Sequence, residues 1–281
     1  MLLAGVQHEN LEAQVEHFRQ NPAIVRFLMG RAEPFLNYLT SEIRRHGLPS
    51  DLILVPMVES AFQADAVSPK QAAGMWQFIP STGQRFGLTV SEDYDARLDV
   101  HPATQAALKY LKYLNGLFKG DWLLTFAAYN AGEGAVQRAV EASIKAGGRG
   151  SFWELDLPAE TEAYVIKILS LAKVIAYPGQ GGTPVTPVQP ALTHVQAGPA
   201  TKVADLIRVS GIVPDEFYRL NPAYKPGVEP PARMHDFLLP RANSEALVAA
   251  QFSGVTVLDL PARTPGLPKG EKKSAARSIQ S

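Results

Sequence analysis

The feature that most constrains this chain is an apolar segment that ends abruptly at a carboxylate. Residues 52–58 are apolar throughout, and Glu59 follows them directly. Ser50 or Asp51 can cap a helix at the start of this segment. Because a helix that is apolar on every side is buried, Glu59 should leave the core at the C-terminal end of a buried helix. Pro56 should distort that helix one turn before the glutamate.

The position of Glu59 predicts a pKa above the ordinary value of a glutamate. Apolar surroundings and the negative end of a helix dipole both disfavour a carboxylate, so both raise the pKa of the side chain. A carboxylic acid that stays protonated near neutrality can act as a general acid on a glycosidic oxygen. By itself, however, a glutamate after an apolar helix more often marks a helix end that meets solvent.

The segment that follows supplies groups that can bind a sugar. Ser60 and Ser68 offer hydroxyls, and the Gln77 amide lies between Trp76 and Phe78 in the sequence. Sugars stack on aromatic rings and need hydroxyl or amide partners, and a cleft with apolar walls and a few polar groups provides both. The two aromatic rings could equally face the core.

Polar and small residues over 63–73 predict a loop or short hairpin that forms one wall of a cleft. Further along, Asp121 can cap a helix that ends near Tyr129 and Asn130. From the residues alone, Tyr129 is predicted to be a partly buried core residue and Asn130 a helix C-cap.

Several short motifs follow one another along the chain. They are Glu59-Ser60, Ser68, Gly74-Met75-Trp76-Gln77-Phe78-Ile79-Pro80 with Ser81-Thr82-Gly83, Gly120-Asp121-Trp122-Leu123-Leu124, Ala128-Tyr129-Asn130-Ala131-Gly132-Glu133-Gly134, and Glu160-Thr161 with Tyr164-Val165. This pattern resembles the soluble lytic transglycosylase (SLT) family, and within it the membrane-bound lytic murein transglycosylase D branch. The resemblance covers roughly residues 15–177.

The resemblance implies a mainly α, lysozyme-like catalytic domain in which Glu59 is the catalytic residue. Its substrate would be the β-1,4 bond between N-acetylmuramic acid and N-acetylglucosamine in peptidoglycan glycan strands. Substrate-binding roles are implied for Ser60, Ser68, Met75, Gln77, Ile79, Tyr129, Asn130 and Tyr164.

The motifs contain one suitable acid, whereas ordinary glycosidases use two carboxylates. Asp65 is close in sequence, but nothing directs it into the cleft. One acid suffices if the substrate supplies the nucleophile. Glu59 would protonate the leaving oxygen and then accept the proton of the muramyl 6-hydroxyl, which closes onto C1 and leaves a 1,6-anhydro end. No cofactor and no metal are expected, and residues 84–100 lack the spacing of a calcium loop.

Three alternatives remain open at this point. A lysozyme-like murein hydrolase would place a second carboxylate across the cleft from Glu59. A non-catalytic murein-binding protein would keep the groove and tolerate the loss of Glu59. A scaffold role would rest on residues 191–240 alone.

Proline and glycine content predicts how the chain is divided. Residues 178–190 hold four prolines and three glycines, a composition typical of a linker. After the linker, a β-α-α-β unit with Leu220-Asn221-Pro222 resembles a degenerate LysM module, a small α+β fold that binds N-acetylglucosamine chains. The predicted divisions are N-terminal helices that pack on the catalytic domain (1–47), the catalytic domain (48–177), the linker (178–190), the LysM-like module (191–240) and a C-terminal extension (241–281). The N-terminal region should hold two helices, the second starting at Pro34. The extension should be disordered from about residue 265.

Charge and composition exclude several classes of protein. The 27 basic and 27 acidic residues balance, so nothing indicates a nucleic-acid partner. The absence of cysteine excludes disulfides, thiolate nucleophiles and cysteine-based zinc sites. No apolar run reaches about 18 residues, so no transmembrane span is expected. The first residues contain neither a signal peptide nor a lipobox cysteine, whereas the resemblance implies the periplasm or cell envelope, including association with the outer membrane.

Overall fold

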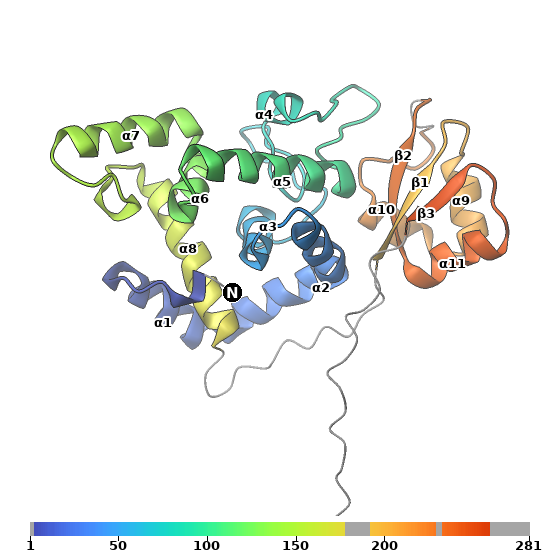
Figure 1. The fold of residues 1–281 in the computed structure, drawn as a ribbon. Coiled ribbons are helices and arrows are strands. Elements are labelled where there is room, and N and C mark those ends of the chain that lie inside the picture. The colour runs from blue at the N-terminus through green and yellow to red at the C-terminus, as the bar shows by residue number, and fades with distance from the viewer. Residues whose placement is uncertain (1–2, 178–191, 229–231, 259–281) are drawn as a thin grey trace, which may run out of the picture.

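The computed structural model describes residues 3–177, 192–228 and 232–258. The predicted linker and the predicted disordered tail lie outside these ranges. Helices α1–α8 form one part of the molecule, and a small sheet with α9–α11 lies beside it (Figure 1). The mainly α fold with a small α+β part is therefore confirmed.

The larger part is built from helices of very different lengths. Single 3₁₀ turns at Leu3–Gly5, Glu9–Leu11, Ser50–Ile53 and Phe152–Glu154 connect them. The α-helices are α1 (Glu12–Gln20), α2 (Pro22–Arg45), α3 (Leu54–Ser60), α4 (Pro80–Arg85), α5 (Val100–Leu117), α6 (Trp122–Ala131), α7 (Glu133–Lys145) and α8 (Ala159–Ala176).

The smaller part is a three-stranded antiparallel sheet with three helices. Its elements are β1 (Leu192–Ala197), α9 (Val203–Ser210), α10 (Pro214–Leu220), β2 (His235–Pro240), α11 (Arg241–Ala249) and β3 (Val255–Leu258). The strand order is β2-β1-β3, with Val195 opposite Phe237 on one side and Val257 on the other. Since β3 pairs with β1, the sheet extends past residue 240, where the predicted module ends.

The second helix begins at Pro22, so the prediction that it starts at Pro34 is wrong. Pro22 occupies the first turn, where its missing N–H costs nothing. Pro34 lies inside the same helix, which continues to Arg45. A buried stripe that includes Phe35 and Leu39 packs into the core and holds the helix together across the lost backbone hydrogen bond.

The apolar segment before Glu59 folds as a 3₁₀ turn followed by α3, not as one capped helix. Neither Ser50 nor Asp51 caps it, because the Asp51 carboxylate accepts a hydrogen bond from the Leu3 backbone N–H at 2.8 Å. Pro56 falls in the first turn of α3, where proline is tolerated. The segment is buried as predicted, and α3 packs against α8.

The central helices position the remaining walls of the site. Asp121 caps α6 as predicted, since its carboxylate accepts the N–H groups of Leu123 and Leu124. Helix α6 packs against both α5 and α8, and α8 packs against α3. Helix α8 therefore brings α3 and α6 together, although α3 is distant from both in the sequence (Figure 1).

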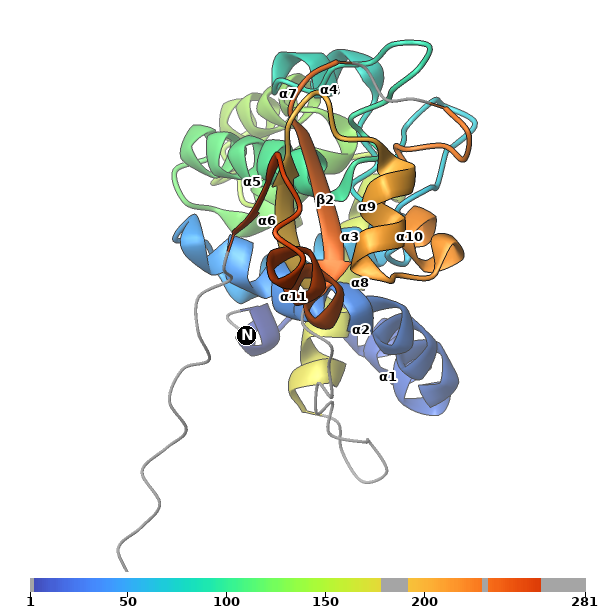
Figure 2. The same ribbon diagram turned by 90° about the vertical axis from the view of Figure 1, so that its right-hand side faces the viewer.

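The smaller part rests on the helical part through buried contacts. Strand β1 contacts α2, and β2 contacts α5, so the sheet and its helices lie in front of these helices in the second view (Figure 2). Asn221 ties α10 to the sheet, because its amide exchanges hydrogen bonds with the backbone of Leu238 at 2.7 and 3.0 Å. The Leu-Asn-Pro motif thus has a structural role in this unit, and its likeness to a LysM module stays a prediction.

Among the described residues, every helix is too short or too polar to cross a lipid bilayer.

Candidate active site

Glu59 lies on the last turn of α3 and lines a pocket of about 500 Å³. The chain leaves the helix through Ala61 and Phe62, both with positive φ angles of 49° and 60°. The pocket draws its walls from α3, the 66–78 hairpin, α4, α5, α6 and α8. Its lining residues are Glu59, Ser68, Pro69, Lys70, Ala72, Gln77, Phe78, Ile79, Thr82, Tyr110, Tyr129, Asn130, Ala131, Gly132 and Glu160.

The environment of Glu59 raises its pKa from 4.5 to about 7, chiefly because burial disfavours the carboxylate. The nearby Glu160 carboxylate adds to this rise, whereas the Tyr164 hydroxyl and the Lys167 ammonium lower the pKa. The upward shift predicted from the apolar segment is confirmed. At neutral pH, Glu59 is therefore divided between its acid and carboxylate forms.

Tyr164 on α8 faces the Glu59 carboxyl from the buried side. Its hydroxyl is buried and has no hydrogen bond of ordinary geometry among the described residues. It is nevertheless close enough to Glu59 to favour the carboxylate.

Ser60 and Met75 connect the end of α3 to the 66–78 hairpin. The Ser60 hydroxyl donates to the Met75 carbonyl oxygen at 2.9 Å, which ties the end of α3 to the hairpin. The Met75 side chain is only 1 % exposed and is absent from the pocket lining, so the prediction that it lines the groove is corrected. Gln77, two residues further on, does line the pocket, and its backbone has a positive φ of 50°.

Gln77 presents its amide to the pocket in a fixed orientation. Its amide nitrogen donates to the carbonyl oxygens of Gly74 at 2.7 Å and Ala66 at 3.3 Å. The amide oxygen makes no hydrogen bond with the described residues and is left to accept one from a ligand. Ser68 also lines the pocket, where its hydroxyl oxygen accepts the Ala72 N–H at 3.0 Å and closes the tip of the hairpin.

Arg97 holds this hairpin in place, a role that the sequence did not suggest. Its buried guanidinium donates to the carbonyl oxygens of Gln71 at 2.6 Å and Phe78 at 3.0 Å. The Asp95 carboxylate pairs with it at 2.7 Å. The chain passes so close to Gly74 that a Cβ there would lie 1.8 Å from the Arg97 carbonyl oxygen.

Tyr129 and Asn130 both line the pocket at the end of α6. The Tyr129 hydroxyl donates to the Trp76 carbonyl oxygen at 2.8 Å. The Asn130 amide oxygen accepts the Thr161 hydroxyl at 2.8 Å, so the amide NH₂ group stays available to a ligand. Thr161, which follows Glu160 in the last of the ordered motifs, thus orients Asn130.

The hydrophobic residues divide between core and pocket. Trp76 is fully buried and its indole N–H donates to the Thr104 hydroxyl at 3.0 Å, so this ring faces the core. Phe78 is buried but lines the pocket, with its ring against those of Tyr110 and Tyr129. Ile79 is 45 % exposed and lines the open side of the pocket.

Other carboxylates near the pocket are less suited to acid chemistry. Glu160 lines the rim, is exposed, and pairs with Lys70 at 3.7 Å. Burial raises the pKa of Glu133, but hydrogen bonds from Arg85 and Tyr110 outweigh this and leave it lowered. Asp65 lines a separate cavity of about 460 Å³ between α2 and α10, where none of the predicted site residues lies.

A family model described as the transglycosylase SLT domain matches residues 38–150. This range contains every predicted site residue except Tyr164. Membrane-bound lytic murein transglycosylase D of Escherichia coli (strain K12) is 34% identical over 250 residues, which cover 88% of this chain and 55% of that protein. The chain therefore spans about half the length of that relative.

Two further similarities are more limited in extent. A protein named for tributyltin chloride resistance, from Alteromonas sp. (strain M-1), is 38% identical over 148 residues, covering 53% of this chain and 71% of that one. The crystal structure of the 70-kDa soluble lytic transglycosylase from Escherichia coli matches with 26% identity and a TM-score of 0.43, covering 53% of this chain and 25% of that one.

Proposed function

Since the chain belongs to the transglycosylase SLT family, we propose that it is a lytic murein transglycosylase with Glu59 as its single catalytic acid and base. The substrate is the β-1,4 bond from N-acetylmuramic acid to N-acetylglucosamine in peptidoglycan. The product keeps a 1,6-anhydro end on the muramyl unit. The activity belongs in the periplasm or cell envelope. The name of the Escherichia coli relative, a membrane-bound lytic murein transglycosylase, supports this location.

The observation that carries the proposal is the state of Glu59. Its pKa of about 7 leaves a large fraction of the acid form at neutral pH, inside a pocket that otherwise offers amides, hydroxyls and aromatic edges. A general acid works best when its pKa lies near the working pH. In the first step, the Glu59 proton passes to the glycosidic oxygen as the bond from C1 to that oxygen breaks.

The neighbours of Glu59 suit the second step. Once ionised, the carboxylate is stabilised by the Tyr164 hydroxyl and the Lys167 ammonium, both of which favour its charged form. It then accepts the proton of the muramyl 6-hydroxyl while that oxygen bonds to C1. No water is consumed, because an intramolecular hydroxyl held near C1 has a high effective concentration.

The remaining groups bind and orient the glycan. The Gln77 amide oxygen and the Asn130 amide NH₂ group offer one acceptor and one donor, which suits the amide and hydroxyl groups of N-acetylated sugars. Ile79 gives an apolar surface for a sugar face. Ser60, Ser68 and Tyr129 act through the backbone contacts that hold the walls.

The test is mass spectrometry of the soluble products released from purified murein. The wild-type protein should release anhydromuropeptides, and Glu59→Gln should release none while still binding murein. Release of anhydromuropeptides by the Glu59→Gln variant would overturn the assignment of Glu59.

A lysozyme-like hydrolase is the second candidate, because Glu160 lies on the rim of the same pocket and influences Glu59. A hydrolase would yield reducing ends, and Glu160→Gln would then reduce the rate by orders of magnitude, as expected for one of a pair of carboxylates. With the single-acid mechanism, Glu160→Gln keeps most of the activity. The same digest thus separates the two reactions.

A further inference from the structure

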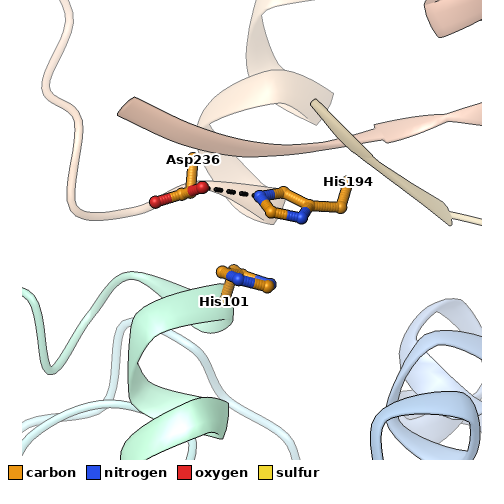
Figure 3. A group of neighbouring side chains, drawn as sticks. All are labelled: His101, His194 and Asp236. Atoms are coloured by element: carbon orange, nitrogen blue, oxygen red, sulfur yellow. Dashed lines mark hydrogen bonds and ion pairs between the residues drawn. The ribbon is translucent and has the colours of Figure 1, made fainter. Parts of the chain in front are cut away.

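Two histidines and an aspartate from different elements meet where the smaller part contacts the helical part. His101 lies in the first turn of α5, His194 in β1 and Asp236 in β2 (Figure 3). One potential ligand atom from each lies within 4.8 Å of the others. The His194 Nε2 atom is 2.6 Å from an Asp236 carboxylate oxygen, and the His101 and His194 rings stack with centroids 3.7 Å apart.

The sheet itself brings His194 and Asp236 together. In the antiparallel register, His194 is opposite Leu238 and Gln196 is opposite Asp236. Since side chains alternate between the two faces of a strand, His194, Gln196 and Asp236 share one face, with His194 and Asp236 as diagonal neighbours. That face is turned to the start of α5, which supplies His101 (Figure 3).

We propose that His101, His194 and Asp236 bind one zinc ion that joins the two parts of the chain. Two imidazoles and a carboxylate form a donor set that suits zinc and not magnesium or calcium, which prefer oxygen ligands alone. Three protein ligands leave a fourth position for water. The proposal is independent of the reaction assigned to Glu59.

The surroundings of the cluster resemble the outer shell of a metal site. The Tyr38 hydroxyl is 2.6 Å from His101 Nδ1, which leaves His101 Nε2 as the ligand atom. A hydrogen bond from Gln196 orients Asp236. Such partners fix the orientation of ligating side chains and raise their affinity for the ion.

Binding needs only a local adjustment. The hydrogen bond between His194 Nε2 and the Asp236 carboxylate would be replaced by a bond from each atom to the zinc ion. Bonds of about 2.0–2.1 Å in a tetrahedral arrangement put ligand atoms roughly 3.3 Å apart. The 2.6 Å contact therefore opens slightly, and the His101 ring tilts out of the stack so that Nε2 points to the ion.

The experiment uses the full chain, freed of metal with a chelator and then dialysed. Isothermal titration with Zn²⁺ should give one ion per chain. Titration with Co²⁺ should produce the intense visible absorption of a tetrahedral site with nitrogen and oxygen ligands. The melting temperature should rise with zinc concentration, because the ion binds the folded state only.

The variants are chosen to separate ligation from folding. Asp236→Asn keeps the size of the side chain and removes its charge, and His101→Ala changes a partly exposed side chain; each should weaken zinc binding by more than about 100-fold. Tyr38→Phe should weaken it roughly tenfold, as expected for an outer-shell partner. His17→Ala, which removes a distant exposed histidine on α1, is the matched control and should bind zinc like the wild type.

The proposal is overturned if the wild-type chain takes up no zinc, or if Asp236→Asn and His101→Ala bind it as tightly as the control. It is also overturned if cobalt binds with the weak absorption of an octahedral ion, since that result indicates a surface site. In any of these three cases, the cluster is a hydrogen-bonded contact between the two parts.

Discussion

At the scale of single residues, the candidate site depends on which polar atoms already make hydrogen bonds within the protein and which are left for a ligand. Gln77 and Asn130 each use one end of the amide for internal contacts, and so each presents a defined end to the pocket. Glu59 differs from them because burial, not a hydrogen bond, sets its state. The roles that we propose for these residues follow from that difference.

The first prediction concerns the pH dependence of activity. Because the general acid must be protonated, kcat/KM should fall about tenfold per pH unit above roughly pH 7, where Glu59 loses its proton. Initial rates on solubilised glycan strands from pH 5 to 9 measure this limb. A limb centred near pH 4.5 would show that burial does not set the acidity of Glu59.

The second prediction concerns stability. The pKa of Glu59 is about 7 in the folded chain and 4.5 as a free side chain, so its contribution to stability is full below pH 4.5 and is lost as pH rises through 7. Between these limits, the wild type should lose up to about 3 kcal/mol relative to Glu59→Gln. Urea unfolding at several pH values measures the difference, with the exposed Glu162→Gln as the charge-matched control.

The third prediction concerns Thr161. Thr161→Val removes the hydroxyl that holds the Asn130 amide, so KM should rise several-fold and the free energy of unfolding should fall by about 1 kcal/mol. Thr161→Ser keeps the hydroxyl and should restore KM. If the serine variant is as impaired as the valine variant, the methyl group and its packing matter, and the hydrogen bond does not.

At the scale of elements, the 66–78 hairpin is the least regular wall of the pocket and the most tightly fastened. Isolated bridges pair Ala73 with Val67 and with Phe78, and Arg97 fastens the hairpin at Gln71 and Phe78. Gly74 lies at the crossing point with a φ of 80°. A short hairpin of this kind has little stability of its own, so these contacts hold its shape.

The fourth prediction tests that fastening. Gly74→Ala should lower the free energy of unfolding by more than about 3 kcal/mol, because the new Cβ meets the Arg97 carbonyl oxygen at 1.8 Å and the φ angle is unfavourable as well. Gly87→Ala is the matched control: its φ is 91°, but nothing lies within 4 Å of a Cβ there. It should cost only about 1–2 kcal/mol for the backbone. Equal losses in urea unfolding would exclude the collision as the cause.

At the scale of the whole molecule, the sheet and the helical part share buried polar contacts. Asp99, just before α5, accepts the Tyr94 hydroxyl at 2.6 Å and the Tyr224 hydroxyl at 3.3 Å, and Tyr224 comes from the smaller part. Both tyrosine rings are buried against each other. Contacts of this kind couple the unfolding of the two parts.

The fifth prediction follows from this coupling. Calorimetry should show one unfolding transition for the whole chain. Tyr224→Phe should keep it single and reduce stability by about 1–2 kcal/mol, since Asp99 loses a buried donor. Tyr218→Phe is the control, because the Tyr218 hydroxyl makes no hydrogen bond with the described residues. Two separate transitions in the wild type would show that the parts unfold independently.

Much of the helical architecture could be predicted from the sequence, since it depends on local signals. The apolar run before Glu59 and the cap at Asp121 each act over a few consecutive residues. Pro34 was misleading because the packing of a long buried face outweighs one missing hydrogen bond. The ordered motifs likewise identified the family before any geometry was known.

The sequence by itself determined that a buried helix ends at one carboxyl group, Glu59. The reason is local, since the apolar run before Glu59 fixes both the burial and the position of this side chain. Only the tertiary structure decided which side chains reach the pocket. Met75 is buried whereas Gln77 lines the pocket, although both lie in the same turn of the 66–78 hairpin. The meeting of His101, His194 and Asp236 depends on strand register and on the docking of two parts. Contacts between residues so far apart in sequence leave no local signal.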